Sequence, residues 1–153
     1  MASLSIGEQA PDFTFSSVRG EVSFSSFAGQ KRILYFYPKD DTPGCTQQAC
    51  DFRDSLAELT QKGYIVIGVS PDTEQSHGKF TRKYDLNFTL VADTDHSIAE
   101  LYGVWKEKSL YGRTYMGIER TTFIINAEGI VTHILPKVKV KGHVEEIRAL
   151  IES

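Results

Sequence analysis

The stretch KRILYFYPKDDTPGCTQQACDFRDSLAELTQ, residues 31–61, decides the fold of this chain. It opens with Lys31 to Tyr37, a near-continuous apolar and aromatic run. Such runs are typical of a strand that is buried on both faces of a sheet. Pro38 ends the strand, and a short polar loop from Lys39 to Thr42 follows. We therefore expect a central strand whose carboxyl end leads directly into the next element.

That next element has the start and stop signals of a helix. Asp41 or Thr42 suits the N-cap position. Pro43 suits the first helical position, where its missing N–H removes no hydrogen bond. We expect the helix to run to about Gln61 and to stop at Gly63.

The apolar stripe of this helix places one of the two cysteines toward the core. Its members recur every three or four residues, which follows one helix face: Cys45, Ala49, Phe52, Leu56 and Leu59. Cys45 therefore lies on the core-facing stripe, in the first turn. Cys50 does not lie on that stripe.

The rest of the chain alternates strand-like and helix-like segments. We expect strands at Asp12 to Phe15, Glu21 to Phe24, Tyr64 to Ser70, Phe88 to Val91, Thr121 to Ile125 and Ile130 to Leu135. We expect helices from Pro71-Asp72 to Tyr84, over Ser97 to Tyr102, and at the end of the chain, where one face carries Val144, Ile147, Leu150 and Ile151. Gly103 to Gly117 reads as a loop, and Asn126 to Gly129 is a hairpin signal.

This order of elements predicts an α/β fold. Right-handed crossovers build a central sheet with helices on both faces, and the closing antiparallel hairpin makes the sheet mixed, with a last helix after it. We expect residues 1–153 to form a single domain, since 153 residues suit one core.

Composition excludes several partners. The formal net charge is −3 with acids and bases interspersed, so neither nucleic acid nor an anionic membrane is an expected partner. The longest clean apolar run, Tyr64 to Val69, is too short to span a bilayer. Met1 to Gln9 lacks the pattern of a secretory signal. We expect a cytoplasmic location, although a plastid protein whose transit peptide has been removed would read the same.

Cys45 has the setting of a reactive thiol. A thiol attacks a peroxide only as thiolate, and the free N–H groups of a first helical turn stabilise an anion by about 0.3–1 kcal/mol or more. A nearby cation would stabilise the thiolate further, and the best candidate is Arg120, at the head of the strand Thr121 to Ile125. The alternative is that Cys45 is a small buried hydrophobe, a common fate of free cysteine.

Cys50 is the only other thiol, five residues further on. A second thiol can condense with the sulfenic acid that a peroxide creates. On a regular helix the two Cα atoms would be roughly 8.7 Å apart, beyond the ~7 Å limit for a disulfide. We therefore predict that the first turns unwind in each catalytic cycle. The alternatives are an inert Cys50 or half of a metal site, but metal is not expected because the four histidines are scattered: His77, His96, His133 and His143.

Several motifs resemble the peroxiredoxin family. YPKDDTPGCT, residues 37–46, resembles its active-site signature, and TQQAC, residues 46–50, narrows the likeness to the bacterioferritin comigratory protein and peroxiredoxin Q group. A second match is YGRTYMGI, residues 111–118, leading into RTTF, residues 120–123. The similarity starts at GEQAPDF, residues 7–13, and covers nearly the whole chain.

This resemblance implies a thioredoxin-like fold and a role for each site residue. Cys45 would be the peroxidatic cysteine and Cys50 the resolving one. Thr42 would hydrogen-bond the peroxide and the thiolate, Arg120 would stabilise the thiolate and polarise the O–O bond, and Pro38 would shield the pocket from water. Hydrogen peroxide and organic hydroperoxides would be the substrates, and no cofactor or metal would be needed. Proteins of this group are commonly reduced by thioredoxin or a similar dithiol, and many are monomers, though dimers occur.

Two other functions stay open at this point. A thiol–disulfide oxidoreductase acting on proteins would prefer Cys-x-x-Cys, whereas Cys45 and Cys50 form Cys-x4-Cys. A redox sensor would use the disulfide only to change shape, and would be oxidised without fast turnover. The unwinding predicted above is compatible with such signalling alongside catalysis.

Overall fold

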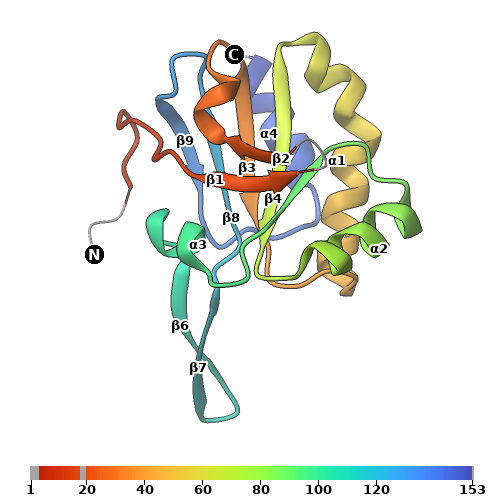
Figure 1. Ribbon diagram of the computed structural model, residues 1–153, viewed down its shortest axis with the longest axis vertical. Coiled ribbons are helices and arrows are strands. Elements are labelled where there is room, and N and C mark those ends of the chain that lie inside the picture. The colour runs from red at the N-terminus through yellow and green to blue at the C-terminus, as the bar shows by residue number, and fades with distance from the viewer. Residues whose placement is uncertain (1–3, 18–19, 153) are drawn as a thin grey trace.

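A five-stranded mixed sheet forms the centre of the molecule, with strand order β5-β4-β3-β8-β9 (Figure 1). The structure, a computed structural model, describes residues 4–17 and 20–152. β3 pairs in parallel with β4 and antiparallel with β8, which confirms both the central strand and the mixed sheet. The strand bounds are Lys31–Phe36 (β3), Tyr64–Ser70 (β4), Thr89–Ala92 (β5), Thr121–Ile125 (β8) and Val131–Leu135 (β9).

Helices cover both faces of this sheet, as predicted (Figure 1). One face carries three helices: α1 (Pro43–Gln61), α2 (Glu74–Tyr84) and α4 (His143–Glu152). The other face carries α3 (Ser97–Leu101), the short 3-10 helix η1 (Phe24–Phe27) and a hairpin of β1 (Thr14–Ser17) and β2 (Gly20–Ser23). Alternate β3 side chains enter the two cores, because successive residues of a strand point to opposite faces.

α1 has the bounds that its capping signals predict. Thr42 occupies the N-cap position with extended backbone angles, and Gly63 turns the chain away with a φ of 86°. Four members of the expected stripe, Cys45, Ala49, Phe52 and Leu59, are at most 1% exposed, and the fifth, Leu56, is half-buried. Burying one side chain such as that of Phe52 contributes about 1.5–3 kcal/mol. This burial fixes α1 against the sheet and fixes the direction in which Cys45 points.

Gly68 of β4 makes room for an aromatic wall behind α1. A Cβ at this position would lie 2.9 Å from Tyr35 Cζ and 2.9 Å from Leu90 Cδ2, too close for any larger residue. The ring of Tyr35 can therefore lie flat over the sheet and stack on Phe52, with 4.7 Å between centroids. The absence of a side chain at Gly68 therefore lets the Tyr35 ring pack between β4 and Phe52 of α1.

The segment Gly103 to Gly117, expected as a loop, is instead mostly a hairpin of β6 (Trp105–Leu110) and β7 (Arg113–Ile118). It projects from the body of the protein (Figure 1), so most of its residues are exposed. Because these strands show little alternation of apolar and polar residues, their sequence did not predict strands. Its turn is Tyr111-Gly112, with φ of 52° and 77°, rather than the more familiar Asn-Gly pair.

Smaller differences from the expected fold concern the ends of strands. The first two strands are shifted by one or two residues from the ranges expected, and β5 begins at Thr89 rather than at Phe88.

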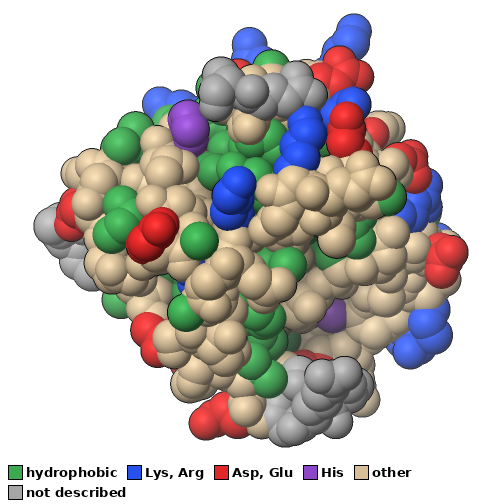
Figure 2. All heavy atoms as spheres, turned by 90° about the horizontal axis from the view of Figure 1, so that it is seen from above, with side chains coloured by type: hydrophobic (Ala, Val, Ile, Leu, Met, Phe, Trp, Pro, Cys, Tyr) green, Lys and Arg blue, Asp and Glu red, His purple; other side chains and the backbone are tan. Residues whose placement is uncertain are grey.

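Viewed from the end of the sheet where the β8–β9 turn lies, basic and acidic side chains are interspersed (Figure 2). Among the described residues, no helix has both the length and the apolar character needed to cross a membrane.

Candidate active site

Three chain segments meet at one edge of the central sheet: the carboxyl end of β3, the first turn of α1 and the start of β8 (Figure 1). Cys45 lies in that first turn and is 1% exposed. Pro43 and Gly44 precede it, so little side-chain bulk surrounds its backbone. The first backbone N–H groups of a helix have no partner within the helix and favour negative charge nearby.

Arg120 provides the cation that the sequence could not place. Its Nη2 donates to Cys45 Sγ at 3.3 Å, and its Nη1 donates to Gln48 Oε1 at 2.6 Å. Gly44 lies beside the guanidinium, since a Cβ there would be 3.5 Å from Arg120 Nη2, an ordinary contact. The backbone N–H of Val138 donates to the Arg120 carbonyl at 2.9 Å and so helps to fix the start of β8. A guanidinium fork held by two partners is well suited to stabilise an anion on sulfur.

Thr42 and Pro38 lie on the loop between β3 and α1. Thr42 holds the N-cap position, but its hydroxyl does not cap the helix; it donates to the Lys39 carbonyl at 2.9 Å. Its single proton is therefore used, and Oγ1 has only lone pairs to offer a substrate. Pro38 directly follows β3 and is half-buried.

Cys50 lies on the same continuous helix as Cys45 and is half-buried. Both cysteines are free thiols. On regular α1 geometry their Cα atoms are roughly 8.7 Å apart, so a disulfide between them requires the helix start to unwind.

Gln48, which was not predicted from the sequence, is 1% exposed and orients Arg120. The signal was present: Gln48 is three residues after Cys45, and this spacing places both on one helix face. A buried polar residue on that stripe had to have a partner.

In the sequence, His77 is one of four scattered histidines. The structure brings it to Asp40 and Asp72, with potential ligand atoms of all three within 4.8 Å of one another. The chain separation of Asp40 and His77, 37 residues, left no local signal of this contact.

Tyr35 and its neighbours keep the wall of the site apolar. Tyr35 is 1% exposed and belongs to the same core cluster as Cys45. Burial, and next the nearby Cys45, raise the pKa of Tyr35 well above its usual range. Tyr35 therefore stays protonated, and its ring forms part of the wall of the site. The arrangement is a thiol held in a dry first turn against a guanidinium, suited to nucleophilic attack by sulfur.

The chain resembles known proteins over nearly its full length. The AhpC/TSA family model matches residues 6–134. Peroxiredoxin Bcp of Bacillus subtilis is 49% identical over 144 residues, covering 94% of this chain and 92% of the relative. Peroxiredoxin Bcp of Escherichia coli is 44% identical over 144 residues, with the same coverage.

Solved structures agree. A cysteine-to-serine mutant of Xylella fastidiosa PrxQ superposes with a TM-score of 0.92 at 32% identity, covering 99% of this chain and 98% of that one. The bacterioferritin comigratory protein of Xanthomonas campestris gives a TM-score of 0.86 at 38% identity, covering 92% and 90%.

The thioredoxin-like sheet, the site at its edge and these relatives define a thiol-dependent peroxidase. The chain belongs to the AhpC/TSA family, within the peroxiredoxins of the bacterioferritin comigratory protein and peroxiredoxin Q group. This confirms the resemblance noted from the sequence. Among the functions that the sequence left open, it favours the peroxidase over a thiol–disulfide oxidoreductase. A peroxide substrate and a thiol reductant follow from the family.

Proposed function

We propose that Cys45 is the peroxidatic cysteine and Cys50 the resolving cysteine of this peroxidase. The observation that carries the proposal is the Arg120 Nη2 to Cys45 Sγ contact of 3.3 Å at the start of a helix. The sulfur anion attacks the terminal oxygen of a hydroperoxide and breaks the O–O bond. The products are a Cys45 sulfenic acid and an alkoxide or hydroxide that leaves as alcohol or water after taking up a proton.

The groups around the sulfur divide the work. Arg120 stabilises the thiolate and then the charge that develops on the breaking O–O bond. Thr42 Oγ1 accepts the hydrogen bond of the peroxide O–H, because its own proton is donated to Lys39. Pro38, half-buried after β3, limits the access of water. The first turn of α1 supplies backbone N–H groups to the anion.

Resolution follows by unwinding. The first turns of α1 open, the Cys50 thiol attacks the sulfenic sulfur, and water leaves as the Cys45–Cys50 disulfide forms. A dithiol, thioredoxin or a similar protein, then reduces this disulfide and is itself oxidised. The chain acts as a monomer in the cytoplasm, on hydrogen peroxide and organic hydroperoxides. The Xanthomonas campestris relative, studied for alkyl peroxide reduction, supports the organic substrates.

Stopped-flow oxidation of three proteins tests these roles: wild type, Cys45→Ser and Cys50→Ser. Cys45→Ser should abolish peroxide consumption. Cys50→Ser should react once and then stall as sulfenic acid or overoxidise, which intact-mass spectrometry detects as added oxygen atoms. Near-full peroxidase activity of Cys45→Ser would overturn the assignment.

A further inference from the structure

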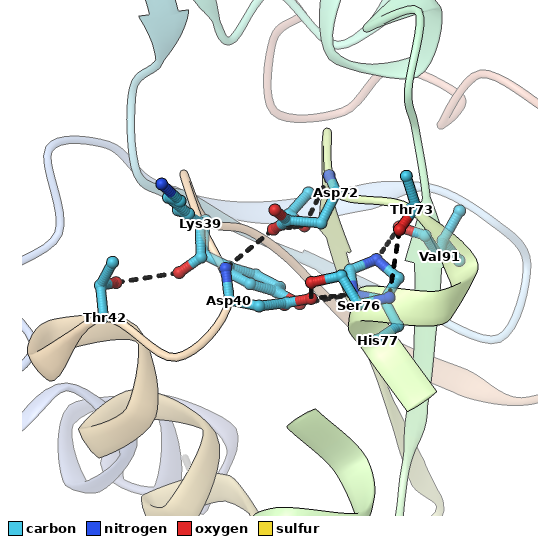
Figure 3. Close-up of polar contacts among 10 residues, drawn as sticks. Lys39, Asp40, Thr42, Asp72, Thr73, Ser76, His77 and Val91 are labelled. Carbon is cyan, nitrogen blue, oxygen red and sulfur yellow. Dashed lines mark hydrogen bonds and ion pairs between the residues drawn. The ribbon is translucent and has the colours of Figure 1, made fainter. Parts of the chain in front are cut away.

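His77 of α2 lies at the centre of a buried polar network beside the loop that leads to Cys45 (Figure 3). The ring is 5% exposed. Its Nδ1 is 2.7 Å from Asp40 Oδ2, and its Nε2 is 3.0 Å from the Val91 carbonyl oxygen. The peroxidase chemistry described above uses none of these groups directly.

The hydrogen-bond partners of the ring determine its protonation. A backbone carbonyl can only accept, so Nε2 carries a proton toward Val91. A carboxylate can only accept, so Nδ1 carries a proton toward Asp40. Neutral imidazole has one N–H and cannot supply both contacts. If Asp40 is ionised, these two contacts together require both ring nitrogens of His77 to carry a proton.

Asp40 is the ionised partner. Burial alone would raise the pKa of its carboxyl, but hydrogen bonds from His77, Tyr37 and Ser76 hold that pKa below its ordinary value. Tyr37 OH donates to Oδ1 at 2.6 Å, and Ser76 Oγ donates to Oδ2 at 2.7 Å. The charge of the buried carboxylate is thus met by one cation and two neutral donors, which makes its position rigid.

The same loop is attached to the protein at further points. The Asp40 backbone N–H donates to Asp72 Oδ2 at 2.8 Å (Figure 3). Asp41 accepts from Lys83 Nζ at 2.8 Å and from Tyr84 OH at 2.7 Å, both near the end of α2. These two bonds hold Asp41 at a φ of 58°, a left-handed conformation that non-glycine residues rarely adopt. The loop is therefore anchored to α2 and to the segment before it, independently of α1.

The anchored loop controls Thr42. Its hydroxyl donates to the carbonyl of Lys39, which directly precedes Asp40 (Figure 3). If Asp40 moved, that carbonyl would move, and the Thr42 hydroxyl could rotate and present its proton to the site instead of its lone pairs. A peroxide O–H needs an acceptor there, so the orientation matters for peroxide and not for the thiol itself.

We propose that His77 is a positioning residue of the peroxidase: as an imidazolium it fixes Asp40, and through Asp40 the loop that orients Thr42 toward the hydroperoxide beside Cys45. The inference rests on the proposed roles of Cys45 and Thr42. The anchor also gives α1 a fixed end from which its first turns unwind.

A cation in place of the Nδ1 proton is the competing interpretation of the Asp40, Asp72 and His77 cluster. The hydrogen bonds within the cluster disfavour a metal ion. Asp40 Oδ2 already accepts from His77 and Ser76, and Asp72 Oδ2 accepts from the Asp40 N–H and from Ser70 Oγ. A metal ion would have to displace these donors.

The first test counts protons on the wild-type protein. A long-range ¹H–¹⁵N spectrum of the reduced protein at neutral pH should show two ring N–H protons for His77. One ring proton, or a stoichiometric divalent cation seen by native mass spectrometry after incubation with zinc or manganese, would overturn the proposal. This readout does not depend on the role of Cys45, so it separates failure of this inference from failure of the proposed function.

The second test compares His77→Leu, which removes both donors, with His77→Asn, whose amide N–H can replace the Nδ1 proton toward Asp40. Misplacing a catalytic contact by about 1 Å can cost up to roughly a hundredfold. We expect His77→Leu to slow oxidation of Cys45 by hydrogen peroxide roughly tenfold or more, and His77→Asn to recover part of the rate. Alkylation of Cys45 by iodoacetamide should stay within twofold in both, since Thr42 does not assist it.

Controls make the second test specific. His133→Asn, on half-buried β9, should react like wild type. In a Thr42→Val background, His77→Leu should have little further effect on the peroxide reaction, because the two changes act on one contact. The inference fails if folded His77→Leu keeps peroxide reactivity within twofold, or if peroxide oxidation and alkylation fall in parallel.

Discussion

The Nη2 atom of Arg120 lies 3.3 Å from the sulfur of Cys45, although 75 residues of chain separate them. The other arm of the same guanidinium is held by Gln48 at 2.6 Å. One cation therefore links the head of β8 to the first turns of α1. In the proposed cycle α1 opens at this end when the disulfide forms, so we expect the Arg120 contact to be present in the reduced protein and to be lost when the helix start unwinds.

Replacing Arg120 should separate its charge from its shape. Arg120→Gln removes the cation and should slow Cys45 oxidation by hydrogen peroxide roughly a hundredfold, the typical effect of losing one preorganised donor to a developing anion. Arg120→Lys keeps the charge but cannot reach both Cys45 and Gln48, so about a tenfold loss is expected. Stopped-flow kinetics measures both. Arg113→Gln, on the exposed hairpin, is the control, and an Arg120→Gln rate within threefold of wild type would remove Arg120 from the mechanism.

Gln48→Glu should reduce reactivity by competing for the same cation. A buried carboxylate three residues from Cys45 would form an ion pair with Arg120 and so weaken the stabilisation that Arg120 gives to the thiolate. We expect roughly tenfold slower oxidation by hydrogen peroxide together with an unchanged fold. Gln47→Glu is the matched control, because Gln47 is exposed and bonds Asp51 instead; it should cost only a few tenths of a kcal/mol in stability. Equal rates for the two variants would contradict this role of Gln48.

Local signals predicted most of the fold. Tyr64–Ser70 forms a strand with the expected bounds because a short continuous apolar run is typical of a strand that is buried in the sheet. Pro43–Gln61 forms a helix with the expected bounds because N-cap residue, proline and terminal glycine agree. The β6–β7 hairpin was missed because it projects into solvent, so its sequence carries no clear two-residue alternation.

The sequence predicted only those parts of the site whose residues lie close together in the chain. Cys45 at a helix start and Thr42 at the N-cap follow from one short stretch of chain. Arg120 could be nominated but not placed, and the contact of Asp40 with His77 crosses 37 residues. Such contacts depend on strand order and register, which no short motif encodes.

His143 should make the stability of the folded protein depend on pH. Burial, with Arg120 acting in the same direction, lowers the pKa of His143 below its usual value, although Glu146 opposes the shift. Its Nε2 lies 2.8 Å from Thr122 Oγ1. Below about pH 6.5 the unfolded chain takes up a proton that the folded chain refuses, so the free energy of unfolding falls as the pH falls through this region.

Urea unfolding of wild type and His143→Gln between about pH 5 and pH 8 measures this effect. The wild type should have the steeper slope below about pH 6.5, by at most about 1.4 kcal/mol per pH unit for one proton. Above about pH 7.5, where the unfolded imidazole is also neutral, the slopes of the two proteins should coincide. Equal slopes on the acid side would show that His143 takes up its proton in the folded state as readily as in the unfolded state.

Gly44→Ala should slow resolution without slowing attack. The new methyl group would lie 3.5 Å from Arg120 Nη2 and 3.9 Å from Val140 Cγ2, which are ordinary contacts, so the guanidinium need not move. Alanine favours the helix over glycine by up to about 1 kcal/mol, and in the proposed cycle this helix start unwinds before Cys50 reaches the sulfenic acid. We expect disulfide formation to slow up to roughly fivefold, while Cys45 oxidation stays within twofold of wild type.

Gly78→Ala tests whether the Gly44→Ala effect is specific to α1. Gly78 lies within α2, which has no part in the proposed unwinding, and its new methyl group would meet only the flexible end of Arg82 at 3.3 Å. It should leave disulfide formation unchanged. Rapid quenching with a thiol reagent, followed by mass spectrometry, separates sulfenic acid from disulfide in each protein. If Gly44→Ala stabilises the reduced protein and yet the disulfide forms at the wild-type rate, the two sulfurs meet without unwinding the first turns of α1.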